Sequence, residues 1–352
     1  MRAPQEGAAQ CQDRELRHIR THIGFSRVGM THVPAAVLDL PLRGIANIVA
    51  GVSLFTVQDA VIKGLSDEYP VFEIVFVRSL VALIPLVILA RVGSGLRSLR
   101  TRRPLVHLLR GSLMFASYTC YYLALATLSL PETVSYSYSA PLFMTALSVP
   151  LLGERVGIRR WAAVIIGFVG VLVIMRPEAS SVSPAALLGV LAGLTYAISA
   201  LLARRLGATD SPEAMAFSAT LIYIAASAAA GIAFGHGHSA AGDAPSMAFL
   251  LRGWTRPSLA DFGLFALCGV IAAFGFYFLA QAYRLAPAAV VAPFEYSSLP
   301  FAVLWGFMFW GTLPGAHLWI GLALVVCSGL YVLRREAIRG PQAPAGDERP
   351  RT

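Results

Sequence analysis

The chain has 352 residues, of which 57% are hydrophobic and 13% are charged, and its mean hydropathy is +0.66. Soluble proteins are about one quarter charged, so these values exclude an ordinary soluble protein and indicate a membrane protein. The formal net charge is +9, but the arginines lie between apolar runs rather than along one exposed face, which argues against nucleic-acid binding.

The first 43 residues are polar and basic, and we expect a disordered cytoplasmic tail there. Met30 offers an alternative translation start. The first long apolar run, residues 44–66, is long enough to cross a bilayer, and it lies too far from the first residue to resemble a cleavable signal peptide. We therefore expect this run to remain as the first helix.

Apolar runs of about twenty residues recur along the chain, and breakers such as Pro70, Pro104, Pro131 and Pro184 lie at or near their boundaries. The runs cover residues 44–66, 71–90, 105–127, 131–152, 158–175, 184–203, 214–234, 259–281, 286–310 and 316–333. They predict an all-α polytopic membrane protein with ten transmembrane helices.

Arginine is concentrated in alternate connections between these runs. The basic connections and the tail hold Arg91, Arg97, Arg100, Arg102, Arg103, Arg155, Arg159, Arg160, Arg204, Arg205, Arg334, Arg335 and Arg339. The other connections are nearly free of basic residues, with Arg176, Arg252 and Arg256 as exceptions. Because basic loops stay on the cytoplasmic side, we expect both termini to be cytoplasmic in a bacterial inner membrane.

The chain also matches itself at an offset of 158 residues. Matched pairs include Tyr138 with Tyr296, Gly153 with Gly311 and Trp161 with Trp319. Five helices per repeat is an odd number, so the second repeat enters the membrane with opposite polarity, and such inverted repeats place a substrate site between them near mid-bilayer. We predict repeats at 44–176 and 184–335, followed by a cytoplasmic tail at 336–352; chance similarity between apolar runs is the alternative.

Two long stretches carry a family resemblance. They are SAPLFMTALSVPLLGERVGIRRWAAVIIGFVGVLVIMRP and QAYRLAPAAVVAPFEYSSLPFAVLWGFMFWGTLP. From about residue 44 to 336 the chain resembles the drug/metabolite transporter superfamily, in particular proteins with paired EamA domains. The segments FEIVFVRS, RPLVHLLRG and APFEY are similar to those of bacterial riboflavin and S-adenosylmethionine uptake transporters. The resemblance implies uptake of a cofactor-like metabolite, with export of amino acids, drugs or other metabolites as the alternative.

Ionisable side chains inside apolar runs cost several kcal/mol, so they are functional candidates by default. Glu295 lies about nine residues into its run, near mid-bilayer and between Pro293 and Pro300, where we expect the helix to be interrupted. We interpret Glu295 as a substrate-binding or proton-binding residue. A structural carboxylate paired with an arginine of the bundle is the alternative.

Two arginines lie within apolar runs. Arg78 is about 10 Å into the second run, where Glu73, Asp59 or Glu295 are its candidate partners. Arg110 is one or two turns inside the third run, from which its side chain could also reach the membrane surface.

Aromatic and oppositely charged residues complete the set of candidates. Tyr121 shares a helical face with Arg110, and the third and fourth runs are rich in tyrosines that could stack a planar ring or simply pack. The candidate set includes Tyr138 and Tyr296. Asp59 and Lys63 are four residues apart in the first run, which predicts a structural ion pair, with substrate or proton binding as the alternative.

Several function classes lack the residues they need. Lys63 is the only lysine and follows Ile62, whereas a phosphate-binding loop needs glycine before its lysine, so the chain is not a P-loop ATPase. His236 and His238 lack further ligands, so we expect a solvated loop there and neither metal nor cofactor. No motif of an intramembrane enzyme is present.

We therefore predict a secondary transporter that works by alternating access. The expected partners are a small-molecule substrate, the lipid bilayer and, if Glu295 titrates, a proton. A homodimer is left open. A membrane scaffold or receptor is the rival class, but it would not need charges within the helices.

Overall fold

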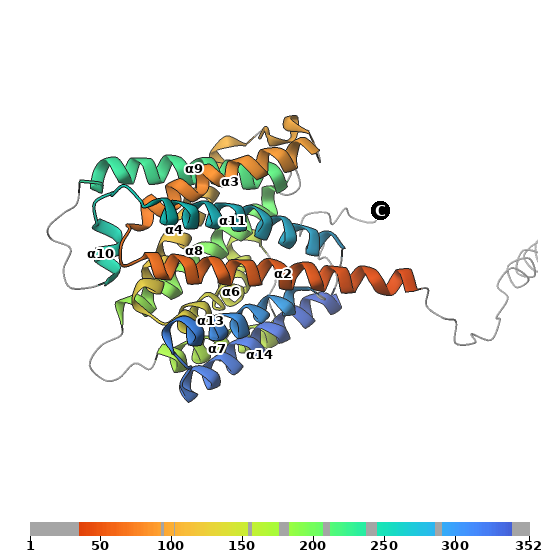
Figure 1. The fold of residues 1–352 in the computed structure, drawn as a ribbon. Helices are drawn as coiled ribbons and strands as arrows, with labels where there is room; N and C mark the ends of the chain where they lie inside the picture. Colours follow the sequence, from red (N-terminus) through yellow and green to blue (C-terminus); the bar gives the residue numbers. More distant parts are fainter. Residues whose placement is uncertain are drawn as a thin grey trace, which may run out of the picture. The chain divides into compact units, whose positions relative to one another are not determined.

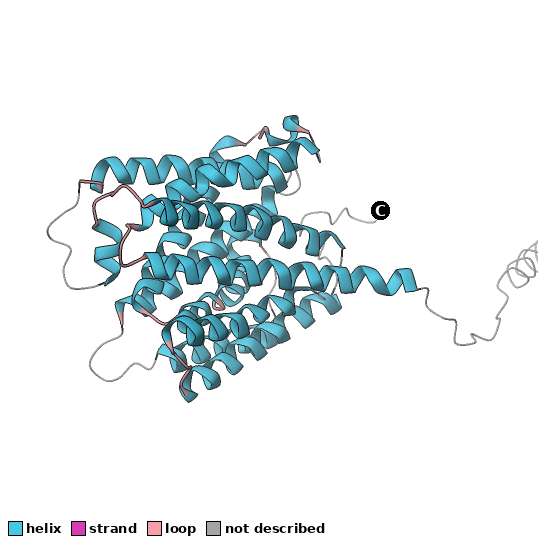
Figure 2. Ribbon diagram, viewed as in Figure 1, coloured by secondary structure: helices cyan, strands magenta, loops and turns pink. Residues whose placement is uncertain are grey.

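The computed structural model describes residues 35–92, 95–101, 103–153, 157–175, 183–206, 212–236, 245–285 and 291–339. These residues form helices and the turns between them, and no strand occurs within those ranges (Figure 2). Residues 40–352 make one compact unit, to which every contact below belongs. Residues 1–39 are a separate unit, of which only the start of α2 is described. Most of the predicted N-terminal tail, and the C-terminal tail after residue 339, lie outside the described residues.

The helices follow the apolar runs closely (Figure 1). Their bounds are α2 Ala35–Leu65, α3 Val71–Val92, α4 Pro104–Thr127, α5 Leu130–Ser137, α6 Ala140–Leu152, α7 Ile158–Met175, α8 Pro184–Leu206, α9 Pro212–Phe234, α10 Pro245–Leu251, α11 Leu259–Leu285, α13 Ser298–Trp310 and α14 Ala316–Arg339, with 3-10 helices η1 Leu96–Leu99 and η2 Ala292–Ser297. Proline opens α4, α8 and α9, where its missing N–H breaks no helical hydrogen bond.

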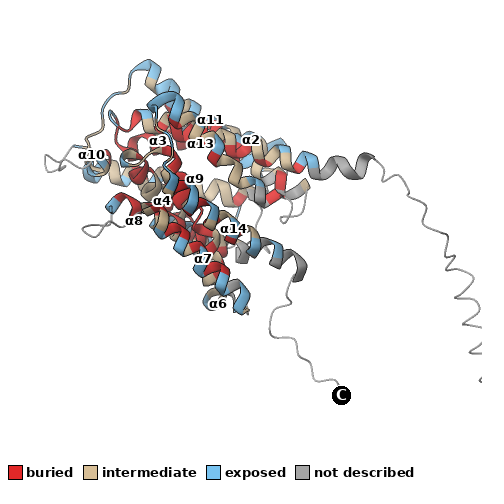
Figure 3. Ribbon diagram, turned by 90° about the horizontal axis from the view of Figure 1, so that it is seen from below, coloured by how far each residue is buried: buried red, intermediate tan, exposed pale blue. Residues whose placement is uncertain are grey.

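Five helices of the described residues are long and apolar enough to cross a membrane: α2, α3, α8, α9 and α11. Shorter apolar segments occupy Trp161–Met175 and Ala316–Tyr331. The outer face of α7 exposes large apolar side chains such as Ile165 and Leu172, whereas buried residues line the interior of the bundle (Figure 3). Lipid covers such faces at no cost, and a helix satisfies its own backbone hydrogen bonds in a bilayer. The chain is thus a multi-pass membrane protein.

The fourth and ninth apolar runs are each divided into two helical pieces. The interruption expected near Glu295 is present, because the 3-10 turn η2 gives way to α13 at Ser298. The fourth run, expected as one helix, breaks between α5 and α6. Pro141 has no N–H with which to continue the helical hydrogen bonds. The backbone N–H groups of Tyr138 and Ser139 donate to the carbonyl oxygens of residues three positions earlier, as in a 3-10 turn.

The helices after these breaks repeat at the predicted offset. The bounds of α6 and α13 differ by 158 residues at both ends, and α7 and α14 begin 158 residues apart. Gly153 and Gly311 end the paired helices with positive φ angles of 71° and 64°, a left-handed C-cap that glycine adopts without strain. The chain therefore contains an internal repeat.

Two glycines at the same offset bring helices into close contact. A Cβ atom at Gly111 of α4 would overlap the Ile222 side chain of α9. A Cβ atom at Gly269 of α11 would lie 2.5 Å from the carbonyl oxygen of Arg78 and 2.8 Å from Cβ of Val81, both on α3. Small residues at helix crossings allow this approach, which is typical of helix packing in membranes.

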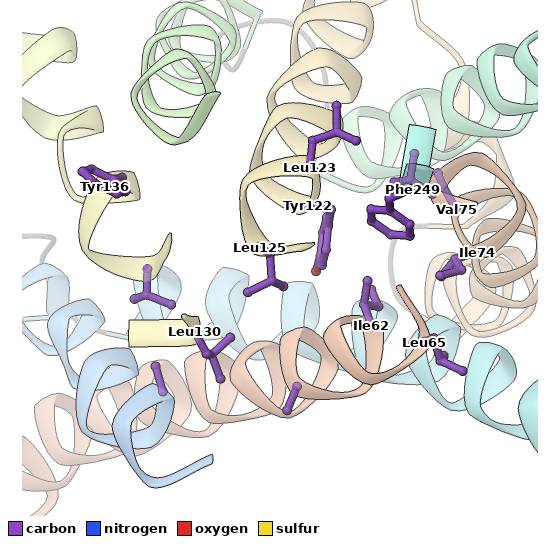
Figure 4. Packing of buried hydrophobic residues seen from close by; sticks show 14 of the residues in the cluster. Ile62, Leu65, Ile74, Val75, Tyr122, Leu123, Leu125, Leu130, Tyr136 and Phe249 are labelled. Carbon is purple, nitrogen blue, oxygen red and sulfur yellow. The ribbon is translucent and has the colours of Figure 1, made fainter. Parts of the chain in front are cut away.

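A buried apolar cluster extends through the bundle, and Figure 4 shows part of it around α2, α3 and α4. Ile62, Leu125 and Phe249 are almost fully buried in it, and Tyr122 from α4 points into the same region. Polar groups buried in such surroundings need partners from the protein itself. The polar side chains that cross this region define the candidate site.

Candidate functional site

Asp59 of α2 is a buried carboxylate held by two tyrosines of α4. The hydroxyl of Tyr122 donates to Oδ1 of Asp59 at 2.6 Å, and the hydroxyl of Tyr121 donates to Oδ2 at 2.8 Å. Asp59 is 8% exposed. In the described part of the chain it has no ion-pair partner, so both of its oxygens are satisfied by neutral donors.

The Gln58 side chain joins this carboxylate site to Arg78 of α3. Its amide lies 3.1 Å from the Tyr122 hydroxyl, and its oxygen accepts from Nη1 of Arg78 at 3.3 Å. Gln58 and Arg78 are both buried. The charges of Asp59 and Arg78 are thus linked through a side-chain amide, without direct contact.

The guanidinium of Arg78 lies against aromatic rings. Its Cζ is 4.0 Å from the ring centre of Tyr118 on α4 and 5.8 Å from that of Tyr223 on α9. The rings of Tyr118 and Tyr122 are 4.2 Å apart. Among the described residues, Nε of Arg78 and the hydroxyl of Tyr118 are buried without a hydrogen-bond partner. We use the name Asp59–Arg78 network for the site formed by Asp59, Gln58, Arg78, Tyr118, Tyr121, Tyr122 and Tyr223.

Helix periodicity assembles this network. Tyr118, Tyr121 and Tyr122 are three and four residues apart, so one side of α4 presents all of them to α2 and α3. Gly269 of α11 lets the backbone of Arg78 approach closely. Gln58 and Tyr223 were missed from the sequence, where a single polar residue or tyrosine within an apolar run gives little signal.

Lys63 does not pair with Asp59, so the predicted ion pair is wrong. The Lys63 ammonium donates to the carbonyl oxygens of Leu125 and Leu128, each at 2.7 Å, and lies 5.6 Å from the ring centre of Trp310. The last carbonyls of a helix have no intrahelical donor, so a lysine there satisfies them and opposes the negative end of the helix dipole. Lys63 thus caps the end of α4.

Arg110 makes its hydrogen bonds outside the Asp59–Arg78 network. Its guanidinium donates to the carbonyl oxygen of Met215 on α9, and Ser199 of α8 donates to the Arg110 carbonyl at 3.1 Å. The neighbouring His107 is buried and lies 2.8 Å from the Ser218 hydroxyl. These contacts join α4 to α8 and α9 rather than pointing Arg110 out of the bundle.

The two tyrosines paired by the repeat meet at the broken helices. The rings of Tyr138 and Tyr296 pack edge to face, 4.9 Å apart, and the Tyr138 hydroxyl lies 2.6 Å from that of Ser298. Tyr138 also donates to the backbone carbonyl of Tyr296 at 3.3 Å. Glu295 is half-buried in the same 3-10 turn. This second group includes three predicted site residues, and the Asp59–Arg78 network includes Asp59, Arg78 and Tyr121.

His236, at the start of the connection between α9 and α11, is exposed, whereas a later segment of this connection packs on the bundle. Residues 245–257, which we call the strap, contain α10, and Phe249 of α10 is fully buried. Ser246 donates to the Leu123 carbonyl at 2.8 Å. His238 lies outside the described residues. The strap therefore packs on the bundle through its apolar side chain and its polar contacts.

Further contacts hold the second half of the strap. Arg252 donates to the Ser66 carbonyl at 2.9 Å, and the backbone N–H of Thr255 donates to Glu73 at 3.1 Å. Glu73 therefore accepts a hydrogen bond from the strap and is not the partner of Arg78. Nearby, the Tyr69 hydroxyl donates to Asp261 at 2.8 Å, and this hydrogen bond to a carboxylate raises the pKa of Tyr69.

Comparison with known proteins identifies relatives of the whole membrane unit. The chain is 33% identical to the riboflavin transporter of Rhizobium johnstonii over 251 residues, which is 71% of this chain and 77% of that protein. It is 24% identical to the S-adenosylmethionine uptake transporter of Rickettsia prowazekii, over 84% of this chain and 94% of that protein. One solved crystal structure matches with a TM-score of 0.57 at 20% identity, over 84% of this chain and 96% of that chain, which supports the fold alone.

The family model describes both repeats. The EamA-like transporter family matches residues 42–176 and 183–334. The resemblance to riboflavin and S-adenosylmethionine uptake transporters is confirmed, and the family is one of transporters rather than enzymes. The chain belongs to the EamA-like transporter family.

Proposed function

We propose that the chain is a secondary transporter of the bacterial inner membrane that carries a small organic metabolite by alternating access. The observation that carries the proposal is the Asp59–Arg78 network, because two ionisable side chains from different helices are buried in an apolar bundle without an ion pair between them. Such charges are expensive in a membrane and are kept where a solute or ion needs them.

In this proposal α5 with α6, and η2 with α13, each count as one span, which gives ten spans in two inverted repeats. The paired contacts of Gly111 with Ile222 and of Gly269 with Val81 support the inversion, since each joins one repeat to the other in an equivalent way. The repeats rock about the region that contains Tyr138 and Tyr296, and both termini are cytoplasmic.

The solute is a cofactor-like metabolite with a planar ring, of which riboflavin is the first candidate. The riboflavin and S-adenosylmethionine carriers among its relatives support this class, because a flavin and an adenine both present flat aromatic faces. The rings of Tyr118 and Tyr223, which lie near the Arg78 guanidinium, are side chains of the kind that pack against such flat groups. The half-buried Glu295 is proposed to border the solute path.

The test is uptake of labelled riboflavin, and separately of S-adenosylmethionine, by a bacterial strain that lacks its own carriers for both. We expect saturable uptake that an Arg78→Ala variant at equal membrane abundance lacks. Faster loss of preloaded solute would instead indicate export. If purified protein in vesicles moves neither compound, nor any of a panel of amino acids and planar metabolites, the scaffold or receptor alternative replaces the proposal.

A further inference from the structure

We propose that Asp59 is the residue that takes up a co-transported proton, and that Arg78 binds an electron-rich acceptor group of the solute, so that the proton and the solute occupy the Asp59–Arg78 network together. The acceptor group is a carboxylate, a phosphate or an imide carbonyl. The inference rests on the transport function proposed above and adds to it the coupling ion, its binding residue and a property of the solute.

The first step concerns the partners of Asp59. Both carboxylate oxygens accept hydrogen bonds from neutral hydroxyls, those of Tyr121 and Tyr122. A hydroxyl can donate to an ionised carboxylate, and after rotation it can accept from a protonated carboxyl. Asp59 can therefore gain and lose a proton while keeping polar partners, which a carboxylate in a tight ion pair does not do.

The ionisable groups that act on Asp59 come from three helices. Tyr118, Tyr121 and Tyr122 face it from α4, Arg78 acts from α3 and Cys268 from α11. Arg78 is the only permanent charge in this set of described residues. Lys63, one turn away on α2, is held by the carbonyls at the end of α4. A change in the charge of Asp59 therefore alters mainly its electrostatic interaction with Arg78.

The second step concerns Arg78. Arg78 is 5% exposed as a whole residue, its Nη1 makes a single long hydrogen bond of 3.3 Å to Gln58, and its Nε has no partner among the described residues. A guanidinium has five N–H donors in a planar arrangement that suits carboxylate, phosphate or paired carbonyl oxygens. The ring of Tyr118 covers one of its faces without satisfying these donors. Arg78 thus keeps hydrogen-bonding capacity for a ligand.

Charge balance links the two steps. When Asp59 is ionised, its charge compensates that of Arg78 across the Gln58 amide. When a proton from water on one side of the membrane binds to Asp59, the charge of Arg78 is left uncompensated in a medium of low dielectric constant. A carboxylate or phosphate of the solute then restores the balance, and a neutral imide carbonyl instead accepts hydrogen bonds from the guanidinium that Asp59 no longer compensates, so proton binding and solute binding favour each other. After the conformational change, the solute leaves and the proton returns to water on the other side.

A substrate-free experiment tests the proton site. Infrared difference spectra between low and high pH are recorded on the purified full chain in lipid, and they report the C=O band of a protonated carboxyl. We expect an Asp59→Asn variant to lose this band, whereas a Glu73→Gln variant, which alters a carboxylate bound to the strap, keeps it. A band that persists in Asp59→Asn and disappears in Glu295→Gln would overturn the assignment.

Transport measurements in vesicles test the coupling. In Asp59→Asn, accumulation of labelled riboflavin or S-adenosylmethionine under a pH gradient should fall at least about tenfold, while exchange of labelled for unlabelled solute continues. Asp59→Glu, which keeps the carboxyl, should restore accumulation, and it carries the test if Asp59→Asn does not fold. Accumulation that is unaffected by Asp59→Asn, or equal for solutes with and without an acceptor group, contradicts the inference. Absence of transport in the unmodified protein would instead count against the proposed function, and the infrared result would still decide the proton site.

Discussion

Tyr138 and Tyr296 are separated by 158 residues and lie in contact, with ring centres 4.9 Å apart. Each lies at the point where a helix is broken, Tyr138 at the end of α5 and Tyr296 in η2. A residue that meets its own repeat-related counterpart lies close to the axis that relates the repeats. The contact between Tyr138 and Tyr296 therefore joins the two repeats.

The first prediction concerns the hydroxyl of Tyr138. Tyr138→Phe removes the hydrogen bonds to Ser298 and to the Tyr296 carbonyl, and we expect it to destabilise the protein by about 1 kcal/mol and to slow transport. Tyr136→Phe on the same helix is the control. Thermal unfolding in detergent and solute uptake measure the two effects. Equal behaviour of the two variants would contradict a special role for this contact.

The second prediction concerns helix packing. Gly269→Ala places a methyl group 2.5 Å from the Arg78 carbonyl oxygen and 2.8 Å from Cβ of Val81, so α11 must move away from α3. We expect a loss of about 1–3 kcal/mol in stability together with weaker solute binding, because Arg78 moves as well. Gly263→Ala, on the same helix but with no atom within 4 Å of the added methyl, should be neutral or slightly stabilising.

The third prediction concerns the strap. Phe249 is fully buried, whereas Met247 on the same short helix is 50% exposed. Phe249→Ala should cost about 3–5 kcal/mol in docking of the strap, and Met247→Ala should cost little. Hydrogen exchange of residues 245–257 measures this difference, which should appear as fast exchange in Phe249→Ala alone. Protection that is unchanged in Phe249→Ala would show that the polar contacts suffice to hold the strap.

The fourth prediction concerns orientation. Because the basic connections mark the cytoplasmic side, a reporter active in the cytoplasm should function after Arg335 but not after Asp67, and a periplasmic reporter should give the opposite result. Fusions at both positions test the two ends of the same proposal. A periplasmic signal after Arg335 would reverse it.

Hydropathy predicted the helices well, because a bilayer demands apolar runs of spanning length wherever a helix crosses. It could not predict the break at Pro141 or the docked strap. A proline is often tolerated within a membrane helix, so its presence alone does not predict a break. The burial of Phe249 depends on contacts with helices that are distant in the sequence. Helix positions are encoded locally, whereas the docking of the strap depends on the folded neighbours.

Side-chain partners were harder to predict than helices. The spacing of Asp59 and Lys63 suggested an ion pair, but the carbonyls at the end of α4 bind Lys63 and two tyrosines bind Asp59. A spacing of four residues places two side chains on one face of a helix, but groups on other helices can bind each side chain in place of the ion pair. Three acidic residues were candidate partners of Arg78 from the sequence, whereas the structure places the Arg78 guanidinium beside Gln58 and Tyr118.

The fifth prediction separates a functional carboxylate from a structural one. The Glu132 carboxylate accepts from the backbone N–H of Ser129 at 3.0 Å, and the backbone N–H of Glu132 donates to the Ser129 hydroxyl at 3.4 Å, which forms a capping box at the start of α5. Glu295 lies half-buried in η2, where α13 is about to begin. Removing a capping interaction costs about 1 kcal/mol, so Glu132→Ala, which deletes the side-chain acceptor, should lower the unfolding temperature with little change in transport per folded molecule.

Glu295→Gln should behave in the opposite way. It keeps the size and most of the hydrogen-bonding capacity of the side chain but removes its charge, so we expect normal abundance and thermal stability with a clear loss of solute uptake. Measuring both properties in both variants distinguishes the roles. If Glu295→Gln lowers stability and spares transport as Glu132→Ala is expected to do, then the carboxylate of Glu295 supports the broken helix, and the solute path must be sought at the Asp59–Arg78 network alone.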